Sequence, residues 1–369
     1  MNIIQAAAIL QFLLVVRGSD VAGERKRVGC YYLGATTERY GTLYPEDIDA
    51  SICTHVLYIH GAINNETQEI YLKPPSQNNK TGGEGFIPRL VKLKAVNPDL
   101  KLILHVLYRQ VDWLSAEPSG RSKIIQNGIK WLNGSGFDGL DIAAAPLSPE
   151  DTEKMADLLC EMKNEFDKYG YSLATSLVGA DEIAEETLGK IARCSDYIAL
   201  LTYFPRGETH RIAPMNMIKS NVDWYVERGI PASKILAVVP AFGAIFTLED
   251  PDDTGLGARV HGPGNDDLEM LGGLGIRNKE LLRKLNDSSL GWTIRRDNET
   301  KEPYAFSNTR LWTSYEDTTS IEYKARYVLE NGLGGIDIVA MEFEDDEGIG
   351  GEGRFPLTRT VYNTFRGGN

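Results

Sequence analysis

Short runs of apolar, β-branched residues recur along this chain and alternate with longer segments that are apolar on one side only. Runs that are apolar throughout are typical of strands buried on both faces of a parallel sheet. The longer segments have the period of amphipathic helices. Eight strands are predicted, at residues 28–33, 52–60, 100–108, 137–143, 172–178, 197–203, 235–242 and 335–341. Six helices are predicted, at 85–96, 122–132, 149–169, 184–192, 218–228 and 321–331.

Eight buried strands separated by helices predict an α/β protein, a closed (β/α)8 or TIM barrel with its helices outside. A doubly wound open sheet is the alternative, because periodicity does not give the order of the strands. No GxGxxG motif follows the first strand. The alternation stops between residues 248 and 307, where only a helix at 278–285 and a strand at 292–294 are predicted. A structureless loop of that length is uncommon in a compact domain.

The N-terminus carries an apolar run at residues 3–16, interrupted only by two glutamines. It is too short to span a bilayer and is typical of the apolar core of a signal peptide. We therefore expect a signal peptide over residues 1–23, with cleavage after Gly18 or after Gly23, and a secreted, extracellular protein. No other stretch is long and apolar enough for a membrane span.

The net charge of −13 argues against nucleic acid and anionic membranes as partners. The one short basic run, Arg25 to Arg27, is expected to be a solvated flank of the mature N-terminus. The histidines show no HxxxH spacing and the cysteines no CxxC spacing, so neither a metal site nor a cofactor is expected. No GxSxG motif supports serine hydrolase chemistry.

Four cysteines in a secreted chain allow two disulfides. Cys30 and Cys53 lie in consecutive predicted strands that a short excursion brings side by side. Cys160 and Cys194 either pair between neighbouring outer helices or remain two buried thiols. Five N-x-S/T sequons are candidate glycosylation sites, at Asn65, Asn79, Asn133, Asn286 and Asn298.

The most informative motif, FDGLDIAAAP, follows the second predicted helix. It resembles the strand-four signature of glycoside hydrolase family 18, DxxDxDxE, whose common form is FDGLDIDWEYP. Asp138 and Asp141 match the first two acids, whereas the third acid falls on Ala143 and the catalytic glutamate on Ala145. A gapped alignment places the glutamate on Ala144, so the acid is missing in either case.

Further blocks extend the resemblance over nearly the whole mature chain. LYPEDIDASICTHVLY, VPAFGAIFTLED and the segment from RLWTSYEDTT to VAMEFEDD follow one another in the family's order. The resemblance implies a TIM-type barrel formed by residues 24–247 and 308–369, whose site opens at the carboxyl ends of the strands. It also implies that residues 248–307 form a small α+β insertion between strands seven and eight, and it matches Cys30 and Cys53 to the family's cysteine pair.

The resemblance implies substrate-assisted catalysis, in which the glutamate protonates the leaving group and the neighbouring aspartate stabilises a cationic intermediate. A methyl group can do neither, and loss of general acid catalysis alone costs on the order of 10²–10⁴ in rate. Positions that contact the sugar in family members also carry different residues in this chain. His105 begins the block that replaces S-x-G-G, Val339 replaces a tryptophan, and Ala244 replaces an arginine. His60 replaces an aromatic residue, and both it and His105 are expected to line the barrel mouth.

Several residues remain candidates for ligand contact. Tyr203 is kept, although Phe204 replaces the aspartate after it. The candidates are Tyr32, Tyr58, Asp141, Tyr203, Phe204 and Glu342. Trp131 and Trp224 are expected on core faces of outer helices.

The surviving acids are expected to have structural roles. Asp141 is predicted to form structural hydrogen bonds, and Asp138 to tie the start of its strand to backbone groups. Glu342, Glu344, Asp345 and Asp346 are predicted to form a solvated acidic loop rather than a cation site.

These observations favour a secreted, chitinase-like protein without catalysis, similar in kind to imaginal disc growth factors and acting as a lectin or a signalling effector. The expected partner is chitin or another glycan that contains N-acetylglucosamine, or a cell-surface protein. The first alternative is a residual chitinase or N-acetylglucosaminidase that uses Asp141 or an acid from another loop. A storage glycoprotein is the second.

Overall fold

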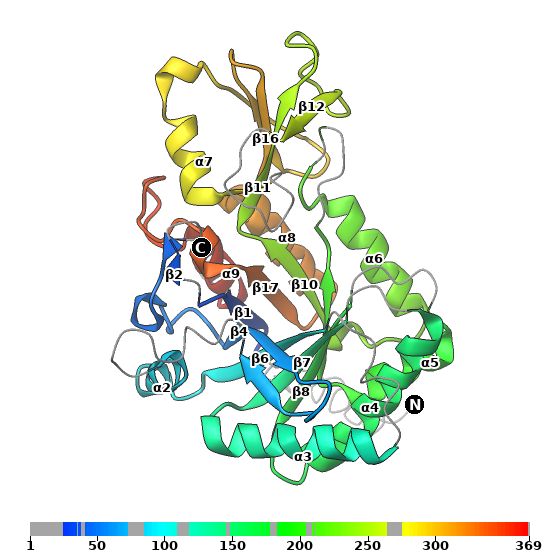
Figure 1. Cartoon of the computed structure of the whole chain (residues 1–369). Coiled ribbons are helices and arrows are strands. Elements are labelled where there is room, and N and C mark those ends of the chain that lie inside the picture. Colours follow the sequence, from blue (N-terminus) through cyan, green and yellow to red (C-terminus); the bar gives the residue numbers. More distant parts are fainter. Residues whose placement is uncertain are drawn as a thin grey trace, which may run out of the picture.

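Eight parallel strands close into a barrel in this computed structural model (Figure 1). The ring runs β1, β17, β10, β9, β8, β7, β6, β4, and pairing of β4 with β1 closes it. This confirms the predicted barrel and excludes the open sheet. The strands are β1 (Arg27–Tyr32), β4 (His55–Ile63), β6 (Lys101–Tyr108), β7 (Gly139–Ala144), β8 (Ser172–Leu177), β9 (Tyr197–Leu201), β10 (Ile235–Pro240) and β17 (Gly335–Val339).

The structure describes residues 25–34, 36–37, 41–72, 85–108, 118–144, 148–177, 183–203, 209, 211–263 and 275–367. The predicted signal peptide lies outside these residues, as do Ala145, Phe204 and Asn79. No helix among the described residues has the length and apolar character needed to cross a membrane.

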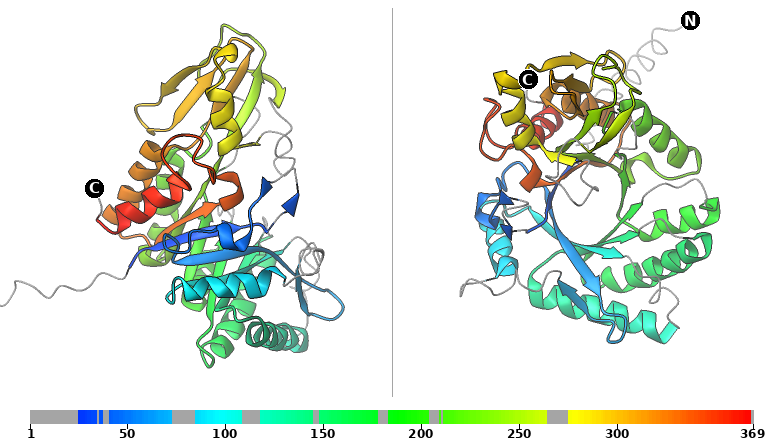
Figure 2. Two further views of the ribbon diagram at one scale, coloured as in Figure 1. Left: turned by 90° about the vertical axis from the view of Figure 1, so that its left-hand side faces the viewer. Right: turned by 45° about the horizontal axis from the view of Figure 1, so that its top comes forward.

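Helices pack around the outside of the ring of strands (Figure 2). The six predicted helices are present, and a further one, α9, packs against α8 and β1. Local sequence fixes the starts of α4 and α8, since Ser148 and Asp317 accept hydrogen bonds from the backbone N–H groups of Asp151 and Ser320. The helices are α2 (Phe86–Lys92), α3 (Pro118–Ser135), α4 (Pro149–Phe166), α5 (Glu185–Cys194), α6 (Met215–Glu227), α8 (Thr318–Glu330) and α9 (Pro356–Phe365).

A second, antiparallel sheet is inserted between β10 and β17 and rises above the barrel in Figure 1. Its order is β12, β11, β16, β15, β14, with β13 paired to β11. This confirms the α+β insertion between strands seven and eight, while its division from the barrel at residues 248 and 307 stays a prediction. The elements are β11 (Phe242–Leu248), β12 (Val260–Pro263), β13 (Gly275–Arg277), α7 (Asn278–Leu285), β14 (Thr293–Arg296), β15 (Pro303–Phe306) and β16 (Leu311–Ser314).

A buried charge cluster joins the insertion to the barrel. Glu302, just before β15, accepts hydrogen bonds from the backbone N–H groups of Ile212 and Ala213 at 2.7 and 3.2 Å. Lys324 of α8 pairs with Glu316, and both side chains are buried. Burial raises the pKa of Glu302, although the charge of Lys324 opposes the shift. The cluster therefore holds two carboxyl groups for one ammonium group.

Three small strands and two disulfides complete the described fold. β2 (Thr36–Thr37) pairs with β3 (Gly41–Thr42), and β5 (Ile70–Leu72) pairs with the far end of β4. Cys30 of β1 is bonded to Cys53, and Cys160 of α4 to Cys194 of α5. The second bond joins two neighbouring outer helices, so the alternative of two buried thiols is wrong.

Candidate functional site

The centre of the barrel holds Asp141, which β7 points inward. The side chain is fully buried, and Oδ2 accepts hydrogen bonds from His105 Nδ1 at 2.7 Å and from Ser176 Oγ at 2.8 Å. The register explains the first contact, because His105 lies directly opposite Asp141 in the β6–β7 pair. Ala143 lies two residues further along the same strand, so its side chain is on the same face as that of Asp141. It is also buried, and its side chain is only a methyl group.

The charge state of Asp141 results from these contacts. Burial raises the pKa of Asp141, but the charge and hydrogen bond of His105, with help from Ser176, outweigh burial and hold the pKa below its usual value. The other carboxylate oxygen, Oδ1, is buried and has no hydrogen-bond partner among the described residues. Asp141 is therefore an ionised, internally bonded carboxylate, whereas a general acid needs a raised pKa.

A buried ion pair lies close to Asp141 in the barrel. Arg27 of β1 donates from Nε and Nη2 to the two carboxylate oxygens of Asp337 of β17, at 3.0 and 3.1 Å. Arg27 is 3% exposed, so the expectation that it belongs to a solvated flank is wrong. Gly29 leaves room for the pair, because a Cβ there would lie 1.9 Å from Asp337 Oδ1.

Asp141 and Asp337 influence one another. Burial raises the pKa of Asp337, Arg27 lowers it, and the charge of Asp141 raises it. Tyr31, whose ring contacts His105 edge-on at 5.4 Å between centroids, has its pKa raised by burial and then by Asp141. The barrel interior is thus a coupled set of charges on β1, β6, β7 and β17.

Replacing His105 with leucine tests the link to Asp141. The variant leaves the buried carboxylate with Ser176 as its hydrogen-bond donor, so the free energy of unfolding at pH 7 is expected to fall by about 1–3 kcal/mol. Because the folded pKa of Asp141 is depressed, its stabilising contribution is present above its ordinary value of 3.8 and lost as pH falls through the folded pKa. Urea unfolding at several pH values measures both effects. His261→Leu, at an exposed residue of β12, is the control, and equal losses for the two variants would contradict the assignment.

The four acids after β17 do not form the solvated loop expected of them. Glu342, Glu344 and Asp345 are buried. The cost of burying them is offset because each carboxylate accepts hydrogen bonds from nearby groups. Glu342 Oε1 accepts from Gly34 N, Glu344 accepts from the N–H and hydroxyl of Thr358, and Asp345 accepts from three backbone N–H groups at 348–350. The fourth acid, Asp346, pairs with Lys279 at 2.6 Å.

Burial raises the pKa of Glu342 to about 7 and that of Glu344 to about 7, with their hydrogen bonds opposing the shift. Glu342 Oε2 is buried without a hydrogen-bond partner among the described residues. Among all the residues that the structure describes, no group of His, Cys, Asp and Glu side chains is arranged to hold a metal ion.

The other candidate ligand-binding residues are mostly buried. Tyr32 donates its hydroxyl to Leu43 O at 2.8 Å and stacks on Tyr58 at 5.9 Å between centroids, and both rings are buried. Tyr203 is 8% exposed and contacts Phe242 edge-on. Their ligand contacts stay predictions. The catalytic-glutamate position Ala145, Phe204 and the side chain of His60 lie outside the described part of the chain.

Asp138 has the expected backbone role, since its Oδ2 accepts from Leu102 N at 2.8 Å. Sequence reasoning missed the His105–Asp141 and Arg27–Asp337 pairs. The available signal was the occurrence of His105 and Asp337 inside runs that are otherwise apolar. Charged residues in such runs are rarely buried unless they are paired.

Four of the five sequons can be placed. Asn65, Asn133, Asn286 and Asn298 are exposed, and Asn133 accepts a hydrogen bond from the hydroxyl of Tyr171. Glycosylation at each stays a prediction.

A family model described as "Glycosyl hydrolases family 18" matches residues 27–344. The match covers most of the chain, including all eight barrel strands and the insertion. The protein belongs to glycoside hydrolase family 18.

Three related proteins illustrate the likeness. Chitotriosidase-1 of Mus musculus is 28% identical over 396 aligned residues, which cover 96% of this chain and 80% of that protein. The crystal structure of the Group IV chitinase of Ostrinia furnacalis superimposes with a TM-score of 0.82 at 27% identity, covering 92% of this chain and 100% of that one. Human YKL-39, described as a pseudo-chitinase with retained chitooligosaccharide binding, has a TM-score of 0.79 at 22% identity, a likeness that bears on the fold alone.

Proposed function

We propose that this family 18 protein binds chitooligosaccharides, or a related glycan that contains N-acetylglucosamine, and does not cleave them. The observation that carries the proposal is the centre of β7. Ala143 stands where the family's third acid is expected, and Asp141 is an ionised carboxylate already bonded to His105 and Ser176. Ala145 adds the loss of the proton donor itself.

Family membership supports the binding half of the proposal. The Ostrinia furnacalis chitinase has also been solved in complex with allosamidin, at 27% identity to this chain. A barrel that superimposes on that chitinase offers a ligand the same approach, from the carboxyl ends of the strands. The corresponding role is that of a lectin or a signalling effector, with a cell-surface protein as the other partner class.

Secretion is part of the proposal. The apolar run at residues 3–16 supports a signal peptide, and the two disulfides support an oxidising compartment. Exposed sequons are compatible with the same route.

The alternative, a residual glycosidase that uses Asp141, has less support. Protonation of a leaving group requires a carboxyl group that holds its proton near neutral pH, and the pKa of Asp141 is lowered. The side chain is also fully buried, so it offers no face to a sugar.

One experiment separates binding from catalysis. The purified secreted protein is expected to be retained on chitin beads and to release no product from a chromogenic chitotrioside. Val339→Arg, at the end of β17, is expected to lower retention at least tenfold, because Val339 is 7% exposed and lies where the resemblance places the sugar-stacking tryptophan. Val226→Arg, at an exposed residue of α6, is the matched control.

The outcomes are distinct. Product release that Asp141→Asn abolishes would establish the residual glycosidase and overturn the proposal. Absence of retention on chitin, with folding confirmed by circular dichroism, would overturn the glycan half and favour a protein partner.

A further inference from the structure

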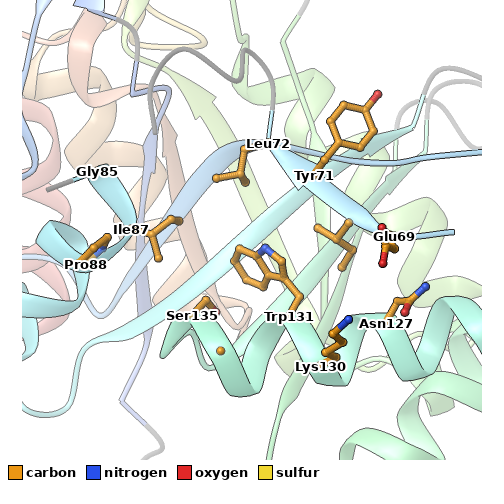
Figure 3. Close-up of a pocket in the computed structure, with 12 residues that line it drawn as sticks. Glu69, Tyr71, Leu72, Gly85, Ile87, Pro88, Asn127, Lys130, Trp131 and Ser135 are labelled. Carbon is orange, nitrogen blue, oxygen red and sulfur yellow. The ribbon is translucent and has the colours of Figure 1, made fainter. Parts of the chain in front are cut away.

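A cavity of about 760 Å³ lies outside the barrel, between α2, α3 and the short strand β5. Figure 3 shows Trp131 at its centre, with Leu72 of β5 above it and Ile87 of α2 at one end. Its volume falls within the range of about 300–1,000 Å³ that is usual for small-molecule sites. Residues 73–84 lie outside the described part of the chain.

Trp131 provides an aromatic surface in this cavity. The side chain is half-buried and packs against the core, as the sequence predicted, and its ring contacts Phe137 edge-on at 5.2 Å between centroids. No described residue accepts a hydrogen bond from the indole N–H. Leu72 and Ile87 add apolar contact area on either side.

The opposite end of the cavity is polar. Glu69 and Lys130 are exposed there, and neither forms an ion pair with any described residue. Asn127 lies beside them and uses its amide N–H groups to bind the carbonyl oxygens of Thr67 and Gln68. The cavity therefore combines an acceptor, a donor and an aromatic surface within one small volume.

This combination matches a sugar ring better than other ligands. A pyranose has an apolar C–H face that stacks on an aromatic side chain, and its hydroxyl groups both donate and accept hydrogen bonds. A purely aliphatic ligand would leave Glu69 and Lys130 without a role. A small ion would meet one exposed charge of each sign, and exposed ion pairs contribute little.

We infer that this cavity, defined by Glu69, Leu72, Ile87, Asn127, Lys130 and Trp131, is a second saccharide site that takes one neutral pyranose unit. It is separate from the barrel mouth and does not depend on the function proposed for that mouth. The side chain of Trp131 stacks on the sugar, while Glu69 accepts from the hydroxyl groups and Lys130 donates to them.

Indole NMR of the ¹⁵N-labelled full-length secreted protein tests the inference. The Trp131 indole resonance is assigned from its loss in Trp131→Phe, with Trp224→Phe as a control on another outer helix. The protein is then titrated with N-acetylglucosamine, glucose, galactose and mannose. At least one sugar is expected to shift the Trp131 resonance saturably, with a Kd on the order of 1 mM. Glu69→Ala/Lys130→Ala is expected to weaken that Kd at least tenfold, and Lys123→Ala, at an exposed lysine of the same helix, is expected to leave it unchanged.

Three results would overturn the inference. The first is the absence of a Trp131 shift with all four sugars. The second is an unchanged Kd in the double variant. The third is loss of the shift in Val339→Arg, which would mean that the resonance reports on the barrel mouth. Retention on chitin beads is scored separately, so failure of this site and failure of the proposed function are distinguishable.

Discussion

Replacing Arg27 with alanine is expected to lower the free energy of unfolding by about 3–5 kcal/mol, the usual effect of removing one partner from a buried ion pair. Asp337 is fully buried and takes both its hydrogen bonds from Arg27. Without the guanidinium group, Asp337 and Asp141 remain as two carboxyl groups in one low-dielectric interior. Chemical denaturation monitored by circular dichroism at pH 7 measures the loss.

Two control variants test whether the loss comes from the buried position of this ion pair. Arg326→Ala removes an exposed pair with Glu322 on α8 and is expected to cost less than about 1 kcal/mol. Arg27→Met/Asp337→Leu replaces the buried pair by apolar side chains and is expected to recover most of the loss. If Arg27→Ala behaves like Arg326→Ala, the pair does not have the buried role assigned to it.

The protein is expected to lose stability as pH rises from about 4.5 to about 7. Burial raises the pKa of Glu342 and of Glu344 from 4.5 to about 7. Between these values the folded state holds protons that the unfolded chain has released, so the free energy of unfolding falls with rising pH. Each shift corresponds to about 3 kcal/mol across the window. The stabilisation is complete below the unfolded pKa and is lost as pH passes the folded one.

Glu344→Gln isolates one of these groups. The amide can still accept from the backbone N–H of Thr358 but cannot ionise, so the variant is expected to gain stability over the wild type at pH 7.5 and to match it near pH 5. Thermal unfolding across pH 5 to 8 measures the difference. Glu322→Gln, at an exposed residue of α8, is expected to leave the pH profile unchanged. A Glu344→Gln profile parallel to that of the wild type would show that Glu344 does not keep its proton.

The barrel could be predicted from the sequence because its strands are buried on both faces and therefore read as continuous apolar runs. The resemblance implies the insertion as a whole, but apart from β14, predicted at 292–294, its strands are not predicted from the pattern, for the opposite reason. β12, for instance, is an edge strand in which Val260 is only half-buried and His261 is exposed, so burial leaves little periodic signal. The helix at Asn278–Leu285 was found, since its apolar residues face one side.

The contacts of the candidate site could be predicted from the sequence only in part. A missing acid at Ala143 is visible in the motif, but the partner of Asp141 depends on the register of β6 against β7. Likewise, the burial of Glu342 and Glu344 comes from backbone N–H groups contributed by residues more than ten positions away. Such contacts exist only once the fold is complete, and composition alone suggests a solvated loop.

The carboxyl group of Glu302 has a consequence for engineering. β11 and β16 are adjacent and antiparallel, so a short turn could rejoin the chain if the residues between these two strands were excised. Such a minimal scaffold would retain Lys324 and Glu316 in one-to-one charge balance. The backbone N–H groups of Ile212 and Ala213 would lose Glu302 as their acceptor, however. A replacement hydrogen-bond acceptor would have to be designed for them.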